Sequence, residues 1–246
     1  MKTKIFARRC LTEMLRDPLT LIFGVGFPVI LLLLLSVMNL NIPAEAQMSI
    51  FEIESLMPAV TVFGFSFLAL FTGLMVSSDR ETAFLTRLYT SPLRAQDFIL
   101  GYALPLFPIG IAQVLVCIAV SFPFGLGFSV HLLTMLATLI PTLILFVGIG
   151  LLVGSCMTNK QVGSVCGALL TNVSAWLSGT WFSLDLMGKG FKTFAFCLPF
   201  ANAVEAARYA LAGDIAAVWK PIAIVSLYAV LVCVASVAVF RKKMKG

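Results

Sequence analysis

Charged residues are scarce in this chain. Only 11% of its 246 residues are Asp, Glu, Lys or Arg, whereas 60% are hydrophobic, and the mean hydropathy is +1.04. Soluble domains carry about 25% charged residues and a smaller apolar share. The composition therefore excludes a soluble domain and predicts an integral membrane protein.

Residues that build catalytic and metal centres are also scarce. The chain has one histidine, His131, and its six cysteines show no CxxC spacing. Cysteines in such a pattern are most simply small, buried apolar residues. A membrane-embedded enzyme would need His, Asp, Glu or Cys groups that converge within the membrane, and no such set is visible. We therefore expect no catalytic residue, no metal site and no enzymatic activity in this chain.

A phosphate-binding loop is missing as well. The nearest stretch, Gly-Lys-Gly-Phe-Lys-Thr at residues 188–193, lacks the G-x-x-x-x-G-K-[ST] spacing. The long apolar segments contain no Asp, Glu, Lys, Arg or His, although carriers driven by protons or ions keep such residues at membrane depth. If the protein moves a substrate uphill, another subunit must supply the energy.

Long apolar runs are what the sequence does contain. A bilayer core of ~30 Å needs about 20 apolar residues per helix. Membrane barrels are excluded because the runs lack the alternation of barrel strands, and helices satisfy their own backbone groups in lipid. We predict an all-α membrane protein with six transmembrane helices. These runs are residues 21–40, 56–77, 98–121, 132–155, 161–182 and 221–240.

The positions of Lys and Arg place both chain ends in the cytoplasm. Most of the 17 Lys and Arg residues lie near the N-terminus, after the second and fourth runs, and at the C-terminus. Cytoplasmic loops hold the excess of positive charge, so the predicted topology is N-in and C-in. The net charge of +6 reflects this rule and the anionic inner leaflet, and we do not expect nucleic-acid binding.

The N-terminal segment, residues 1–18, has the pattern of a basic amphipathic helix. Ala7, Cys10 and Met14 share one helical face, and basic side chains such as Arg8 lie opposite. We expect this helix to lie in the inner headgroup region, in contact with membrane lipids. The alternative is a basic flank that only fixes the topology.

A charged segment, residues 79–97, interrupts the apolar chain between the second and third runs. Up to residue 90 it contains no Gly or Pro, and Phe84, Leu85 and Leu88 form an apolar stripe with charged residues around it. The pattern predicts a short amphipathic helix on the cytoplasmic surface, stopped by Pro92. The segment is long enough for a soluble partner to grip. The alternative is an interfacial helix without a partner.

Residues 183–217 are too polar for a further span and too apolar for a free loop. Phe200 and Val204 belong to a series of apolar residues at helical spacing, whereas Glu205 and Arg208 fall on another face. The last two are three residues apart and are positioned to pair. The alternative is an amphipathic helix at the membrane interface.

Three motifs resemble those of a known family. DRETAFLTRLYTSPL, residues 79–93, is similar to the cytoplasmic signature of ABC-2-type transporter permeases, in which an acid-Arg-acid cluster precedes a small residue, Pro and Leu. The triplet Arg-Asp-Pro at 16–18 and LPFANAVEAARYALAGD at 198–214 agree with it. The resemblance covers essentially the whole chain, as a single transmembrane domain of residues 1–246.

The resemblance implies a half-transporter. In that family two membrane subunits form the pore, as a homodimer or with a homologous partner. Residues 79–92, within the loop 79–97, would form a coupling helix that rests in a groove of a separate ATP-binding subunit, present in two copies. ATP and Mg²⁺ would be bound there, so no cofactor is expected in this chain. By matching position, the expected coupling contacts are Arg80, Glu81, Leu85, Arg87, Leu88 and Pro92.

The resemblance also implies an extracellular gate. Residues 183–217 would form short helices that re-enter from outside, with Phe200, Glu205 and Arg208 as gate residues. The pair of Glu205 and Arg208 would bond within the chain or across the dimer. The expected location is the bacterial inner, or cytoplasmic, membrane, which the chain crosses several times.

An uncharged pathway suits a hydrophobic or amphipathic substrate, such as a drug, a lipid-like molecule or a modified peptide, moved out of the cytoplasm. The 21 Phe against 3 Trp and 4 Tyr favour apolar cargo. The alternatives are a polysaccharide or glycolipid exporter of the same architecture and a passive channel without an ATPase partner. A channel would have no need of the helix at 79–92.

Overall fold

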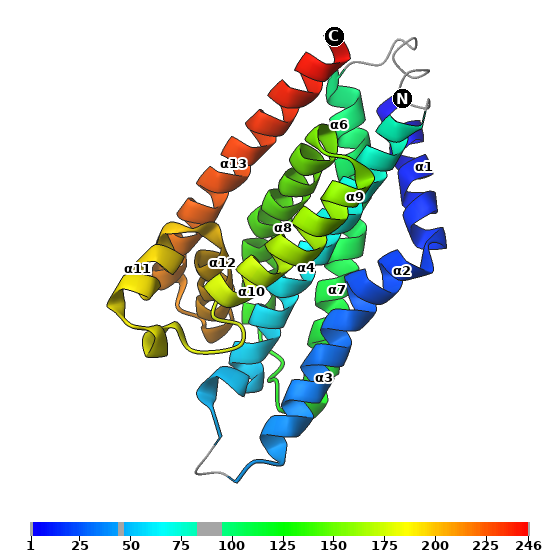
Figure 1. Cartoon of the computed structure of the whole chain (residues 1–246). Coiled ribbons are helices and arrows are strands. Elements are labelled where there is room, and N and C mark those ends of the chain that lie inside the picture. The colour runs from blue at the N-terminus through cyan, green and yellow to red at the C-terminus, as the bar shows by residue number, and fades with distance from the viewer. Residues whose placement is uncertain (1, 44–46, 83–94, 246) are drawn as a thin grey trace.

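The computed structural model describes residues 2–43, 47–82 and 95–245. All secondary structure in those residues is helical, which confirms the predicted all-α class. The helices run side by side in an elongated bundle, and the N- and C-termini lie at the same end of it (Figure 1).

Within the described residues, five helices are long and apolar enough to cross a membrane, and each contains one of the predicted runs. The first of these consists of three consecutive helical segments, of which the middle one is π-helical. The five spans are Pro18–Leu40, Ile53–Glu81, Asp97–Phe124, His131–Cys156 and Ile215–Lys242. The first consists of α2 (Pro18–Leu21), η1 (Ile22–Gly26) and α3 (Phe27–Leu40), and the third of α6 (Ala95–Ala103), α7 (Leu106–Ser121) and η4 (Phe122–Phe124). The second is α4 (Ile53–Glu81), the fourth is α8 (His131–Cys156), and the fifth lies within α13 (Ile215–Lys245).

The predicted run at 161–182 is helical only as far as Leu177, and it is not one of these five. It consists of α9 (Asn159–Val162), the π-helical η5 (Gly163–Leu170) and α10 (Thr171–Leu177). This helix is shorter than the other five and carries polar side chains such as Lys160, which lower its mean hydropathy. The six-span count therefore stays a prediction.

Helices α4 and α8 form the centre of the bundle. In the most apolar 18-residue window of each span, 78% of α4 and 56% of α8 is buried, against 28% of the first span and 17% of α13. Glycines let the two central helices approach closely. A Cβ on Gly150 would lie 2.3 Å from the carbonyl oxygen of Ala69, and one on Gly154 would lie 2.5 Å from that of Gly73. Close contact between small residues is a common means of joining helices in membranes.

The N-terminal helix α1 (Lys2–Arg16) packs against α6. Its predicted apolar face is confirmed, since Cys10 is buried there. On the same side, the ring of Phe6 meets the rings of Phe98 and Tyr102 edge-on, at centroid distances of 5.7 and 4.9 Å. The apolar face of α1 is therefore covered by protein, so only its other sides are available to membrane lipid.

The segment before α13 folds as a 3₁₀ turn, η6 (Leu184–Met187), and two helices, α11 (Lys189–Cys197) and α12 (Pro199–Ala212). Helix α12 packs against α4, α8 and α13, with Phe200 and Val204 buried. It is therefore a packed helix of the bundle and not an amphipathic helix at the surface. The pair α11 and α12 lies beside the part of α13 that is remote from the C-terminus (Figure 1).

Candidate functional site

The last turn of α4, which we call the α4 terminus, lies at the end of the bundle that holds both chain ends (Figure 1). It comprises Asp79, Arg80 and Glu81, and the helix ends at Glu81, before Thr82, whose backbone is extended. The expectation of a separate helix that starts at Asp79 is therefore wrong at its beginning. No Gly or Pro interrupts α4 at this point, so the helix of the second span simply continues to Glu81.

Asp79 is the buried acceptor of the α4 terminus. Its carboxylate accepts two hydrogen bonds from the guanidinium of Arg9, at 2.7 and 3.0 Å, and one from the hydroxyl of Tyr102, at 2.8 Å. These hydrogen bonds raise the pKa of the Arg9 guanidinium. A carboxylate is stable when buried only if it has such partners. Asp79 therefore joins α4 to α1 and α6.

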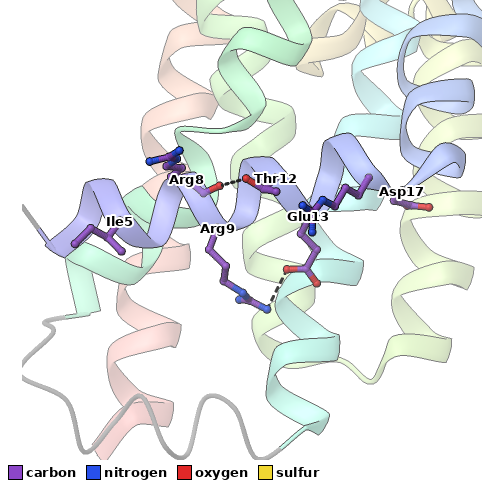
Figure 2. A pocket seen from close by; sticks show the side chains of 7 residues that line it. Ile5, Arg8, Arg9, Thr12, Glu13 and Asp17 are labelled. Atoms are coloured by element: carbon purple, nitrogen blue, oxygen red, sulfur yellow. Dashed lines mark hydrogen bonds and ion pairs between the residues drawn. The ribbon is translucent and has the colours of Figure 1, made fainter.

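Arg9 also forms an ion pair along α1. Its guanidinium lies 3.0 Å from the carboxylate of Glu13, one turn further on. Figure 2 shows Arg9 pointing toward Glu13 while Arg8 points to another side of the helix. These residues border an open pocket of about 590 Å³ on the outside of α1. Arg9 thus belongs to the internal network, whereas Arg8 is exposed.

The other two residues of the α4 terminus contact the turn between α8 and α9. The guanidinium of Arg80 donates hydrogen bonds to the carbonyl oxygens of Gly154 and Met157, at 2.7 and 3.2 Å. The carboxylate of Glu81 accepts a hydrogen bond of 2.7 Å from the backbone N–H of Asn159. Both residues, which the sequence suggested as contacts to another subunit, therefore have partners within this chain.

The remaining predicted coupling residues, Leu85, Arg87, Leu88 and Pro92, lie outside the described residues. The helices on either side of this segment are both tied to α1. Asp79 of α4 accepts hydrogen bonds from Arg9, and Asp97 of α6 accepts one of 2.6 Å from the hydroxyl of Thr3. The two ends of the predicted coupling segment are thus held on the same helix.

A second polar region is a pocket of about 530 Å³, here called the α12 pocket, at the other end of the bundle. Its walls come from the residues that lead into and begin α4, the segment after α10, α11 and α12. Arg208 donates hydrogen bonds to the carboxylate of Glu205, at 3.2 Å, and to the carbonyl oxygen of Ser55, at 3.1 Å. Burial lowers the pKa of Arg208, and Glu205 opposes that shift. The predicted pair of Glu205 and Arg208 forms within one chain.

The third predicted gate residue, Phe200, does not line the α12 pocket. Its ring packs against that of Phe146 on α8, with a centroid distance of 5.9 Å. Lys192 and Asp185 form an ion pair at the pocket, and the hydrogen bond to Asp185 raises the pKa of Lys192. The structure thus brings two of the three predicted residues together and adds a second charged pair.

Sequence reasoning missed Arg9 and Tyr102 as partners of Asp79. Several arginines lie on the polar side of α1, and nothing in their local pattern marks the one that reaches a carboxylate 70 positions away. In the parts of the chain that the structure describes, no three His, Cys, Asp or Glu side chains are grouped to hold a metal ion.

The model of the ABC-2 type transporter family matches residues 1–212, which include the α4 terminus and all but the end of the chain. The chain belongs to the ABC-2 type transporter family. No curated relative of the chain was found. Family membership agrees with the resemblance of the three sequence motifs.

ABC-2 type proteins are membrane subunits of ABC transporter systems, which contain an ATPase partner. This chain is therefore a multi-pass membrane protein of such a system. Subunits of this family are typically not catalytic. Among the described residues, the α4 terminus and the α12 pocket each bring charged side chains from different parts of the chain together.

Proposed function

We propose that the chain is the permease subunit of an ATP-driven exporter that moves a hydrophobic or amphipathic molecule out of the cytoplasm. ATP and Mg²⁺ bind to the separate ATPase subunit, and this chain carries no cofactor. The observation that carries the proposal is the α4 terminus, where three charged residues tie α4 to α1, α6, α8 and α9 at the start of the predicted coupling segment. A movement of that segment would therefore be passed through these hydrogen bonds to α1, α6, α8 and α9.

In this proposal Leu85 and Leu88 are the apolar anchors in a groove of the ATPase, and Arg87 and Pro92 set the register and the end of the coupling helix. Apolar side chains that fill a pocket supply most of the energy of such a contact, while charges at its rim give specificity. The α12 pocket lies at the opposite end of the bundle, where an extracellular gate formed by α11 and α12 would open to release substrate.

Two copies of the permease, or this chain and a homologous one, form the pore in the proposed assembly with two ATPase subunits. The low burial of the first span and of α13, 28% and 17% of their apolar windows, leaves apolar faces for a second copy and for lipid. The proposed location is the bacterial inner membrane.

Co-purification tests the ATPase partner. We expect an ATPase with a phosphate loop to accompany the chain from its native membrane in mild detergent. Leu85→Asp and Leu88→Asp should each leave the chain in the membrane but abolish the association, because a carboxylate cannot be buried in an apolar groove without a partner. The matched control is Leu186→Asp in η6, at the other end of the bundle, where the side chain is exposed.

The control variant should retain the ATPase. Retained association in the Leu85→Asp and Leu88→Asp chains would contradict the coupling contact. If no ATPase accompanies the unmodified chain, a passive channel becomes the better explanation.

Cysteine labelling tests the proposed sixth span. Cys156 at the end of α8 and Cys197 at the end of α11 are exposed, and the helix from Asn159 to Leu177 lies between them. If that helix crosses the membrane, a membrane-impermeant maleimide should label Cys156 only in inside-out vesicles and Cys197 only in right-side-out vesicles. Labelling of both cysteines from one side, mapped by mass spectrometry, would show that it does not cross.

A further inference from the structure

The turn between α8 and α9 brings two helix ends of opposite polarity together. Helix α8 ends at Cys156 and α9 begins at Asn159, with Thr158 as its N-cap. The last carbonyl groups of a helix lack donors and carry partial negative charge, and the first N–H groups lack acceptors and carry partial positive charge. A single turn thus presents both kinds of unsatisfied group.

The α4 terminus matches these charges residue by residue. Arg80, a cation, donates to the carbonyl oxygens of Gly154 and Met157 at the end of α8. Glu81, an anion, accepts from the N–H of Asn159 at the start of α9. The hydroxyl of Ser77, one turn earlier, lies 3.2 Å from the side-chain oxygen of the same asparagine. Hydrogen bonds with a charged partner are the stronger kind, so the α4 terminus grips both helix ends.

The two sides of the turn differ in how firmly they are attached to α4. On the α8 side, a Cβ on Gly154 would lie 2.5 Å from the carbonyl oxygen of Gly73, so the backbones of α4 and α8 are in contact. On the other side the chain enters the π-helical η5, which meets α4 through side chains: a Cβ on Gly167 would lie 3.4 Å from the side chain of Leu70. Segments of π-helix are frequent at functional sites. Arg80 and Glu81 therefore hold the chain at the point where the tightly packed α8 ends and the helix containing η5 begins.

We propose that Arg80 and Glu81 are positioning residues that pass a movement of the α4 terminus to the start of α9, and so to η5, and are not contacts to the ATPase. The inference rests on the proposed function, in which the ATPase acts on the segment that follows Glu81. It replaces the role that the sequence suggested for these two residues.

The experiment compares backbone hydrogen exchange in residues 159–170 of the assembled complex, reconstituted in lipid nanodiscs, in two states. One state is free of nucleotide, and the other is trapped with MgATP and vanadate. In the unmodified complex the exchange of this segment should differ between the states. In Arg80→Gln and Glu81→Ala complexes the difference should be lost, while the ATPase still co-purifies.

Glu81→Gln is the matched control. Its amide oxygen still accepts the hydrogen bond from Asn159, although the charge is gone. The positioning role therefore predicts that Glu81→Gln retains the nucleotide-dependent difference that Glu81→Ala loses. A direct ionic contact to the ATPase predicts instead that both substitutions weaken co-purification.

Three results would overturn the inference. One is the absence of a difference between the two states in the unmodified complex. The second is a Glu81→Ala complex in which exchange rises equally in both states and the difference persists, which indicates fraying of α9 alone. The third is loss of the ATPase from the Arg80→Gln and Glu81→Gln chains. Failure of the proposed function is distinguishable from these, because then no ATPase accompanies the unmodified chain.

Discussion

The α4 terminus and the α12 pocket are both clusters of charged residues at the ends of one bundle, but they are built differently. At the α4 terminus, Asp79 accepts three hydrogen bonds from side chains of two other helices. In the α12 pocket, the guanidinium of Arg208 is largely buried, yet its Nη2 atom has no hydrogen-bond partner among the described residues. The buried carboxylate of Asp79 thus has several hydrogen-bond partners, whereas one donor of the buried Arg208 has none among the described residues.

The difference bears on what each end can do. A fully satisfied buried network holds its helices in one arrangement, whereas a partly satisfied one gives up less when it rearranges. The hydrogen bonds of the α4 terminus therefore agree with the proposed transmission of a movement from the coupling segment to the helix bundle. The α12 pocket, where one buried donor of Arg208 has no protein partner among the described residues, agrees with the proposed gate, whose contacts would change during transport.

The largest expected effect on stability comes from removing the carboxylate of Asp79. Asp79→Ala removes the acceptor of Arg9 and of the buried Tyr102 hydroxyl, and we expect a loss of roughly 3 kcal/mol in the free energy of unfolding. Helix α1 should then separate from α6 and expose Cys10. Burial raises the pKa of the Cys10 thiol to about 12, so in the unmodified chain this thiol is protonated and shielded at neutral pH. Melting in detergent and the rate of Cys10 alkylation by N-ethylmaleimide measure the two effects.

Glu13→Gln is the matched control for Asp79→Ala. It removes the other carboxylate that faces Arg9, but that ion pair is exposed, with 35% and 52% of the two side chains accessible. Exposed pairs of this kind contribute at most about 0.5 kcal/mol. Equal destabilisation by the two substitutions would show that Asp79 is not the centre of the cluster.

A smaller effect is expected in the α12 pocket. Arg208→Gln removes the hydrogen bonds to Glu205 and Ser55 but also removes a buried, incompletely paired cation, so we expect a loss of about 1 kcal/mol in unfolding free energy. Lys192→Gln, which breaks the exposed pair with Asp185, should cause no measurable shift of the melting temperature. A loss in Arg208→Gln as large as that in Asp79→Ala would remove the contrast between the two ends.

Local pattern was sufficient to predict most helices of this chain. The apolar runs at 56–77 and 132–155 are the cores of α4 and α8, and the periodicity of residues 200–211 marks α12. The sequence pattern misplaces the end of α4 because a charged turn does not by itself stop a helix. The partners of Arg80 and Glu81 lie more than 70 positions away in the sequence, and local periodicity does not predict contacts at such a separation.

By itself, the sequence determined that this is a helical membrane protein with the motifs of the ABC-2 family, because hydropathy, charge placement and short motifs are local properties of the chain. Only the tertiary structure decided that α1 packs against α6 and that the carboxylate of Asp79 accepts hydrogen bonds from Arg9 and Tyr102. It also decided that Arg80 and Glu81 form hydrogen bonds with the turn between α8 and α9. Those contacts arise from the packing of helices that are distant in sequence. Burial in that packing requires a charged group such as Asp79 to have partners, because an unpaired buried charge is too costly to keep.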